Sequence, residues 1–290
     1  MSNKNQFSVA IPIYKIKLSN FEKQSLHQCL SILGKYTISF VHPNSFNFEK
    51  FCQINDIDQD NYYFKNIAFE DEYFKGISGY NRLLLSELFY TSFQNFEYIL
   101  IYQLDAWVFK DEIKFWISQN YDYIGAPWID LNYKTPWSNL HGVGNGGFSL
   151  RRVNTFIKVL RSYKFYILPC KDFQILWSEY RKNLLEFNDD FKFRNRLIVL
   201  IKCLIRMFGY QNNLSFYRSF KINEDIFWSV YVPKVFKDFY IPSVDIASQF
   251  AIETSPEERM KSISPELPFG CHAWEKWNRE FWKHYIKALH

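Results

Sequence analysis

The stretch FSVAIPIYKIKLSNFEKQSLHQCLSILGKYTISFVHP (Phe7–Pro43) decides the fold. Its first seven residues, FSVAIPI, form an apolar, β-branched run that is typical of a buried strand. Phe21–Leu33 then carries apolar side chains at helical spacing, and Gly34 follows as a stop signal. Thr37–Val41 is a second β-branched run. A strand, a helix and a strand in close succession predict a parallel βαβ unit, and therefore an α/β fold.

The rest of the chain continues with strands and helices. Further strands are predicted at Tyr62–Phe69, Tyr98–Tyr102, Tyr121–Ile124, Gly146–Leu150, Phe239–Ile241 and Phe250–Glu253, and helices at Tyr80–Phe93, Glu224–Val230 and Trp274–Leu289. Residues 151–220 are predicted to be mostly helical. Because no repeat or linker interrupts the pattern, we expect one mixed α/β domain over residues 1–290, with a basic, mostly helical insertion at 151–221.

The composition limits the class of protein. Hydrophobic residues make up 48% of the 290 residues, so a large core can form and general disorder is excluded. Aromatic residues reach 20%, and part of them could offer flat surfaces to sugars. The five cysteines are odd in number and lack C-x-x-C spacing, which argues against a disulfide framework and for a reducing compartment. The polar N-terminus carries no signal-peptide pattern, so we expect a cytoplasmic protein.

The positive charge is local. Residues 151–221 hold 15 Lys and Arg against 5 Asp and Glu, whereas the whole chain has a net charge of +5. Within this region, residues 194–208 are mostly apolar and include the basic residues Arg194, Arg196, Lys202 and Arg206. They could lie on the inner face of an anionic cell membrane beside a lipid-linked acceptor, or form a buried helix whose cations snorkel to solvent. No nucleic-acid-binding motif is present, and the rest of the chain is net acidic.

A carboxylate follows the most apolar strand. In YILIYQLDAWVF (Tyr98–Phe109), Asp105 stands just beyond the end of the strand. Ligands of open α/β sheets bind at the carboxyl ends of strands, and a carboxylate there is a natural ligand for Mg²⁺ or Mn²⁺ bridging a diphosphate. The alternative is a helix cap or an aspartate in a solvated turn.

Three other segments carry candidate chemistry. HGVGNGGFSLR (His141–Arg151) has four glycines in six residues, so its backbone can approach a ligand closely or simply form a turn. Its spacing is not that of a P-loop. Glu224 and Asp225 begin an apolar helix, either as capping charges or as a general base for an acceptor hydroxyl. His272, in the turn PFGCHAW, is either a metal ligand or a structural histidine.

Read in order, these segments resemble nucleotide-diphospho-sugar transferases of the GT-A fold, and in particular the bacterial glycosyltransferase-like family called domain of unknown function 5672. The similar segments are GYNRLLLSELFY (Gly79–Tyr90), YILIYQLDAWVF (Tyr98–Phe109), YDYIGAPW (Tyr121–Trp128), GNGGFSLRR (Gly144–Arg152), EDIFW (Glu224–Trp228), FAIE (Phe250–Glu253) and PFGCHAW (Pro268–Trp274). The resemblance covers roughly residues 60–290. It implies a GT-A-like, mostly parallel sheet flanked by helices.

A more distant resemblance is to family 8 glycosyltransferases, which place an Asp-x-Asp pattern after an apolar strand. That resemblance implies that Arg82 approaches the donor and that Asp105 and His272 bind Mn²⁺ or Mg²⁺. Gln103 stands where the pattern has its first aspartate. An amide oxygen is a neutral and weaker ligand, so the metal requirement becomes a point to test.

The resemblance also implies roles for other residues. Ile11, Pro12 and Tyr14 would lie at the end of the first strand, where such folds hold the nucleotide base. Asn145, Gly146 and Gly147 would line the pocket of the donor sugar, together with Gln103. Trp128 would stack on an acceptor sugar or pack in the core, and Asp225, assisted by Glu224, would be the catalytic base.

We therefore expect a glycosyltransferase that moves a sugar from a nucleotide sugar, with UDP as the nucleotide, to a glycan in bacterial surface polysaccharide or lipopolysaccharide assembly. Two other functions remain open. Gln103 fits a non-catalytic module that binds a glycan or nucleotide sugar. The acidic residues would also fit a glycoside hydrolase, but the sequence places no two carboxylates at the separation that this reaction needs.

Overall fold

The computed structural model describes residues 5–128, 142–162, 165–167, 210–212, 223–263 and 266–286. The chain divides into two compact units, which are described separately: Met1–Leu160 with Ile222–His290, and Arg161–Lys221. The single domain expected from the sequence stays a prediction. The basic segment 194–208 lies outside the described residues.

The predicted βαβ unit is confirmed in the first unit. Strand β1 (Asn5–Pro12) pairs in parallel with β2 (Thr37–Pro43), and α1 (Asn20–Leu33) connects them. A capping box begins α1, because the Ser19 hydroxyl accepts from the Glu22 N–H and the Glu22 carboxylate accepts from the Ser19 N–H.

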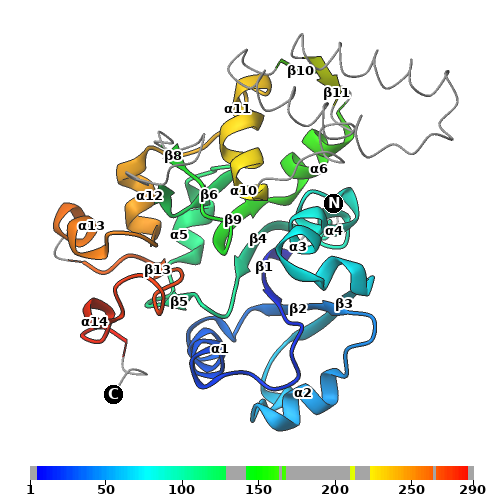
Figure 1. Ribbon diagram of the computed structural model, residues 1–290, viewed down its shortest axis with the longest axis vertical. Helices are drawn as coiled ribbons and strands as arrows, with labels where there is room; N and C mark the ends of the chain where they lie inside the picture. Colours follow the sequence, from blue (N-terminus) through cyan, green and yellow to red (C-terminus); the bar gives the residue numbers. More distant parts are fainter. Residues whose placement is uncertain are drawn as a thin grey trace, which may run out of the picture. The chain divides into compact units, whose positions relative to one another are not determined.

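The central sheet has six strands in the order β3 (Phe64–Phe69), β2, β1, β4 (Phe96–Tyr102), β9 (Phe148–Arg152) and β6 (Tyr123–Gly125). The pairs from β3 to β4 are parallel, and β9 runs antiparallel to both of its neighbours. Figure 1 shows the sheet, with helices on both of its sides. The predicted mixed α/β fold with a mostly parallel sheet is confirmed.

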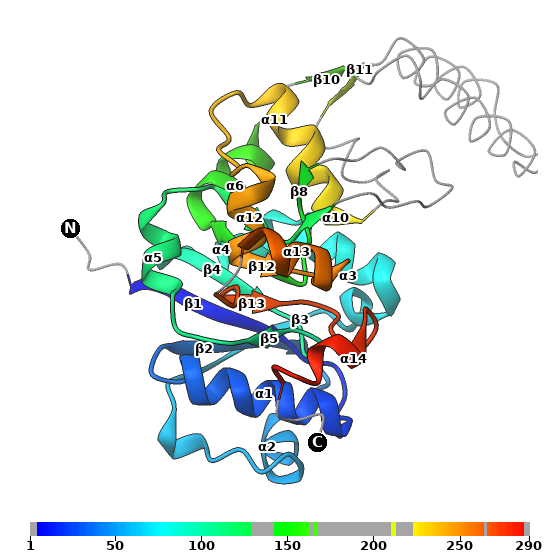
Figure 2. The same ribbon diagram turned by 90° about the vertical axis from the view of Figure 1, so that its left-hand side faces the viewer.

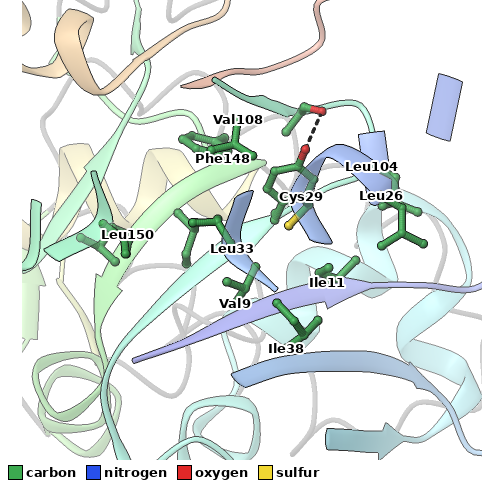
Figure 3. Packing of buried hydrophobic residues seen from close by; sticks show 14 of the residues in the cluster. Val9, Ile11, Leu26, Cys29, Leu33, Ile38, Leu104, Val108, Phe148 and Leu150 are labelled. Atoms are coloured by element: carbon green, nitrogen blue, oxygen red, sulfur yellow. Dashed lines mark hydrogen bonds between the residues drawn. The ribbon is translucent and has the colours of Figure 1, made fainter. Parts of the chain in front are cut away.

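Side chains alternate between the two faces of this sheet, as the pleat requires. Figure 2 shows α1 and α2 (Phe48–Ile54) on one side and α6 (Val153–Arg161) and α10 (Glu224–Ile226) on the other. On the α1 side the buried core combines aliphatic side chains with aromatic rings such as those of Phe40, Phe51 and Tyr102. Figure 3 shows Val9, Ile11 and Ile38 of the sheet near Leu26, Cys29 and Leu33 of α1.

The second face carries an aromatic cluster and one buried cation. The ring centroids of Phe156 and Trp228 lie 4.0 Å apart, and those of Tyr90 and Phe156 lie 4.8 Å apart. Tyr90 belongs to α4 (Glu87–Thr91) and Trp228 to a π-helical turn, η4 (Phe227–Tyr231), that continues α10. Arg151 of β9 is buried on this face.

A small second sheet positions the candidate site. It consists of β12 (Ala251–Ile252), β13 (Gly270–Cys271) and β5 (Trp107–Val108), in that order. β12 is parallel to β13, and β13 is antiparallel to β5. Because β5 follows β4 after a short turn, the small sheet connects the carboxyl end of a central strand to the C-terminal part of the chain.

Short elements complete the first unit. They are η1 (Gln59–Asn61), η2 (Asp71–Phe74), α3 (Gly76–Leu84), α5 (Ile113–Ser118), β7 (Pro127–Trp128), β8 (Gly142–Val143), α11 (Val232–Val235), α12 (Val244–Phe250), α13 (Pro256–Ile263) and α14 (Arg279–Trp282). In the second unit, β10 (Phe165–Ile167) and β11 (Tyr210–Asn212) pair antiparallel. Within the described ranges, no helix has the length and apolar character needed to cross a bilayer.

Several predicted elements were wrong. The helix expected at Tyr80–Phe93 is two helices, α3 and α4, because the Ser86 hydroxyl accepts from the Phe89 N–H and starts a new helix. The strand expected at Phe239–Ile241 does not form, since the N–H of Tyr240 donates to the Asp122 carboxylate. The helix expected at Trp274–Leu289 is reduced, among the described residues, to α14.

The interpretation of residues 151–220 as mostly helical was wrong at its start, where Arg151 and Arg152 belong to strand β9. Helix α6 follows them, and β10 and β11 are two further strands within this range. The remaining residues of the range lie outside the part of the chain that the structure describes.

Candidate functional site

The small sheet brings Asp105 and His272 together. Cys271 of β13 pairs with Trp107 of β5 in antiparallel register, so the residue after β13 lies beside the residues that precede β5. Figure 1 shows β5 and β13 next to each other. The Nε2 atom of His272 lies 3.1 Å from Oδ1 of Asp105. The two predicted metal ligands are therefore close enough to share one ion, since Mg²⁺ and Mn²⁺ bind their ligands at roughly 2.0–2.6 Å.

Gln103 supplies a third donor. Its Oε1 atom lies 3.3 Å from Nε2 of His272. The backbone N–H of Gln103 donates to the Gly147 carbonyl, and its carbonyl accepts from the N–H of Ala106, so the turn after β4 is fixed at both ends. Among the described residues, no group of three or more His, Cys, Asp and Glu is placed to hold a metal. A cation at this position would thus have two strong ligands and one neutral amide oxygen.

The local charges favour cation binding at this point. Burial lowers the pKa of His272, but the carboxylates of Asp105 and Glu253 outweigh burial and raise it to about 10. Burial raises the pKa of Asp105, yet the adjacent imidazolium lowers it below its usual value. The positive charge of the protonated imidazole therefore partly neutralises the carboxylates of Asp105 and Glu253. A divalent ion that displaces the proton on Nε2 would meet the carboxylate of Asp105 and the amide oxygen of Gln103, so this donor set fits a hard cation.

At two positions of the loop before β9, only glycine fits without a steric clash. A Cβ atom at Gly147 would overlap the imidazole of His272, and one at Gly146 would lie 2.5 Å from Oε1 of Glu224. The side chain of Asn145, which is buried, accepts from the Gly147 N–H at 3.0 Å and stabilises the turn. Two neighbouring residues of one loop thus separate the His272 ring from the acidic start of α10.

Glu224 is held in a buried ion pair with Arg151. The Nη2 atom of Arg151 lies 2.7 Å from Oε1 of Glu224, and Nη1 lies 3.0 Å from Oε2. The side chains of this pair are 0% and 4% exposed. Arg151 also donates to the hydroxyl of Tyr90, the carbonyl of Gly146 and the hydroxyl of Ser149. This bidentate pair fixes α10 against β9 and occupies both carboxylate oxygens of Glu224.

Asp225 is the carboxyl group, among the described residues, whose pKa is raised most. Burial and the neighbouring charge of Glu224 raise its pKa to about 8, and its own hydrogen bond from the Ile226 N–H offsets only part of this. Glu253 contributes further repulsion. A carboxyl group with a pKa near physiological pH can accept or release a proton there, as a general base must.

The other predicted donor residues lie at different places. Ile11 is a core residue with 0% exposure, so it can offer a ligand only its backbone. Pro12 ends β1, and Tyr14 beyond it is 60% exposed. Arg82 on α3 is exposed, with its guanidinium 5.9 Å from the ring centroid of Tyr73 and an Nη2 contact of 3.4 Å to the Glu72 carbonyl.

Trp128 of β7 is 7% exposed, and its ring fills the space beside Gly144, where a Cβ atom would overlap it. Most of its surface is thus covered by the chain. Stacking of an acceptor sugar on Trp128 stays a prediction.

A pocket of about 170 Å³ adjoins Asp105. The loops that follow β1 and β4 contribute to its lining, which includes Lys15, Ser19, Asp105 and Trp274. Lys15 is paired with Glu22 at 2.8 Å, which raises the pKa of the lysine. The lining thus combines apolar side chains with the ammonium group of Lys15 and the carboxylates of Glu22, Asp105 and Glu275.

Three residues that contact the candidate site residues were not predicted from the sequence. Arg151 lies in the segment SLRR and Glu253 in FAIE. Both segments were part of the family resemblance, but neither residue was given a role. Tyr80, in GYNR, contacts Gln103 through a side-chain hydrogen bond, and burial raises its pKa. An acid directly after a two-residue strand was the one usable signal for Glu253, and it is weak without knowledge of the strand pairing.

Among the solved structures similar to this chain are three glycosyltransferases, each at low sequence identity. The galactosyltransferase LgtC, in complex with donor and acceptor sugar analogs, has a TM-score of 0.47 and 10% identity, covering 97% of this chain and 96% of LgtC. GlyE from Streptococcus pneumoniae TIGR4 has a TM-score of 0.44 and 10% identity, covering 98% of this chain and 62% of GlyE. The mannosyltransferase Ktr4p from S. cerevisiae, in complex with GDP, has a TM-score of 0.41 and 9% identity, covering 55% of this chain and 60% of Ktr4p. At these values the similarity says nothing about donor or acceptor.

No curated protein sequence matches this chain significantly. The family described as "Protein of unknown function (DUF5672)" matches residues 63–272, a range that contains every candidate donor around His272 as well as Arg151, Glu224 and Asp225. Because this match covers well over half of the chain, the protein belongs to the DUF5672 family.

Proposed function

We propose that this protein is a GT-A-type, metal-assisted glycosyltransferase that moves a sugar from a nucleotide sugar to a glycan acceptor. The observation that carries the proposal is the arrangement around Gly146 and Gly147. On one side of these glycines, Asp105, Gln103 and His272 converge; on the other lies the acidic start of α10, with Asp225. Because Gly146 and Gly147 are neighbours, the candidate cation site and the candidate base lie on either side of one short stretch of backbone.

The donor side of the proposal uses Asp105, Gln103 and His272. A divalent Mn²⁺ or Mg²⁺ ion bound there would offset the negative charge of a leaving diphosphate. The nucleotide, which we propose to be UDP, would occupy the pocket lined by Lys15 and Asp105 and extend toward Tyr14. Asn145, Gly146 and Gly147 would line the donor sugar, as the family resemblance implies.

The acceptor side of the proposal uses Asp225. Its pKa of about 8 suits a group that takes a proton from a sugar hydroxyl near neutral pH. Glu224 does not serve as the base in this scheme, because both of its oxygens accept from Arg151. It holds the helix start in place and raises the pKa of its neighbour.

The direct test is donor turnover. Purified protein is incubated with single nucleotide sugars and Mn²⁺, with and without a mixed glycan acceptor pool, and the release of nucleoside diphosphate is measured. A thermal-shift screen of the same nucleotide sugars identifies the donor first, since a ligand that binds only the native state raises its Tm. Turnover of a bound donor supports the proposal, and absence of turnover with every bound donor contradicts it.

The second candidate function is a non-catalytic module that binds a glycan or nucleotide sugar. Gln103 favours it, because an amide in place of a carboxylate weakens a metal site that has only two charged or imidazole ligands. Binding of nucleotide sugars without any diphosphate release would decide for this alternative.

The cellular setting rests on sequence alone. The acceptor we propose is a lipid-linked glycan of bacterial surface polysaccharide or lipopolysaccharide assembly, reached from the cytoplasmic face of the membrane through residues 194–208. The support is the excess of Lys and Arg in residues 151–221. Co-sedimentation with anionic liposomes tests it: wild type is expected to sediment, and a variant with Arg194, Arg196, Lys202 and Arg206 changed to Gln is expected to stay in solution. Equal sedimentation of both proteins would rule out the docking.

A further inference from the structure

Glu253 lies beside the imidazole of His272. Ile252 of β12 pairs with Cys271 of β13 in parallel register, so the residues that follow the two strands are also neighbours. The Oε1 atom of Glu253 lies 3.2 Å from Nδ1 of His272. The Glu253 side chain is 15% exposed, so this contact is largely shielded from water.

The backbone around His272 is already fixed by the strands. The N–H of His272 donates to the Ile252 carbonyl at 3.0 Å. The next residue, Ala273, has a φ of 48°, a left-handed conformation that alanine adopts only where the surrounding structure imposes it. What the backbone leaves free is rotation of the imidazole ring about its own side-chain bonds.

Ring rotation decides which nitrogen faces the donor set. With Nδ1 directed to Glu253, Nε2 faces Asp105 at 3.1 Å and Oε1 of Gln103 at 3.3 Å. A ring turned away from Glu253 would lose both of these approaches, because the two ring nitrogens point in different directions. Gly147 leaves space for the observed orientation only by lacking a Cβ.

We infer that Glu253 is a positioning residue of the metal site: it accepts the Nδ1–H of His272 and thereby presents Nε2 to the ion shared with Asp105 and Gln103. The inference rests on the divalent cation in the proposed function. Carboxylates that orient a metal-binding histidine typically contribute 10–100-fold to metal affinity. With a neutral amide as the third donor, the orientation of the imidazole carries a larger share of the affinity than in a site with three charged ligands.

The experiment measures Mn²⁺ affinity rather than turnover, because Glu253 also raises the pKa of Asp225 and would change the rate for a second reason. Full-length wild type, Glu253→Ala, Glu253→Gln and Glu49→Ala are titrated with Mn²⁺, and free Mn²⁺ is followed by electron paramagnetic resonance. Glu49 is exposed on α2 and controls for the loss of one negative charge. Tm without metal is measured on every variant.

We expect Glu253→Ala to bind Mn²⁺ about 10–100-fold more weakly than wild type, and Glu49→Ala to bind it equally well. Glu253→Gln retains an oxygen that accepts the Nδ1–H, so its affinity should lie closer to wild type than to the alanine variant. A merely structural role would lower the Tm of both Glu253 variants without this difference in Mn²⁺ affinity.

Two results would overturn the inference in distinguishable ways. If wild type and Glu253→Ala bind Mn²⁺ equally well, Glu253 does not position the ligand, although the metal site stands. If wild type shows no saturable Mn²⁺ binding, the proposed metal site fails and the positioning role fails with it. Should Glu253→Ala not fold, Glu253→Asp takes its place, because its carboxylate is one methylene too short to reach Nδ1 from the same backbone.

Discussion

The Nε2 atom of His272 lies 3.1 Å from Oδ1 of Asp105, although one residue ends a turn after the fourth central strand and the other follows a two-residue strand near the C-terminus. The contact is produced by the pairing of β5 with β13. The strength of a metal site at this contact would depend on the third candidate donor, Gln103, whose amide oxygen lies close to the same nitrogen. The first prediction therefore changes this donor.

Gln103→Glu is expected to strengthen Mn²⁺ binding, on the order of tenfold, because a carboxylate of the same shape replaces a neutral oxygen. Isothermal titration calorimetry of the purified variant gives the affinity. Gln24→Glu, an exposed site on α1, is the control for the added negative charge. Unchanged Mn²⁺ affinity in Gln103→Glu would mean that position 103 does not face the ion.

Gly147→Ala is expected to abolish measurable Mn²⁺ binding, because the added Cβ would overlap the His272 imidazole and force the ring away. Gly142→Ala is a matched control in the same part of the chain, where a Cβ would meet no atom of the described residues within 4 Å. Both variants are compared by Mn²⁺ titration and by Tm. Normal Mn²⁺ binding by Gly147→Ala would show that His272 is not a ligand in the observed orientation.

Asp225→Asn is expected to keep donor affinity but to lose transfer by roughly 10²-fold or more, because an amide cannot accept the acceptor proton. In wild type, the rate should rise with pH through about 8, since the base form is the ionised carboxylate. Donor affinity, turnover and Tm are measured on the same preparation. Transfer at the wild-type rate would leave Asp225 with a structural role at the start of the helix.

The same residue makes a separate prediction about stability. Because the pKa of Asp225 is raised to about 8 on folding, the folded protein binds more protons than the unfolded chain between about pH 4 and pH 8. The free energy of unfolding contributed by this group therefore falls as the pH rises through that window. The Tm of Asp225→Asn relative to wild type should increase from pH 4 to pH 8, whereas Asp60→Asn, at an exposed site, controls for the loss of a surface carboxylate.

Glu224→Ala is expected to lower the free energy of unfolding by about 3–5 kcal/mol, because it leaves the fully buried guanidinium of Arg151 without its counter-charge. The comparison is Lys158→Ala, which removes an exposed ion pair with Asp238 and should cost less than about 1 kcal/mol. Urea unfolding at neutral pH measures both. Equal losses would show that the buried pair contributes little.

Local sequence patterns were sufficient for the first half of the sheet. The strands β1 and β2 and the helix between them follow from hydrophobic periodicity and from the stop at Gly34, both of which act within a few residues. The position of Asp105 just beyond β4 followed from the same reasoning. The sequence also indicated that His272 and Asp225 carry chemistry, because each stands in a segment of the family resemblance.

Predicted elements failed where a single side chain or an unusual backbone angle overrides periodicity. Ser86 caps a new helix inside an otherwise continuous apolar stripe. Near the C-terminus, Ala273 and Asn278 both have positive φ. These angles are not helical, so one helix cannot run through the start of the range Trp274–Leu289. Tyr240 satisfies its backbone with Asp122 and not with a strand partner.

The sequence by itself determined the kinds of chemical group in the site and the strand ends that carry them. Only the tertiary structure decided their partners. Glu224 forms an ion pair with Arg151, and Asp225 has a raised pKa. The two ring nitrogens of His272 contact Asp105 and Glu253. The physical reason is strand register. A shift of one residue in the pairing of β12, β13 and β5 would separate Asp105, His272 and Glu253, which flank these strands, and the energy that fixes register comes from burial across the whole core rather than from any local segment.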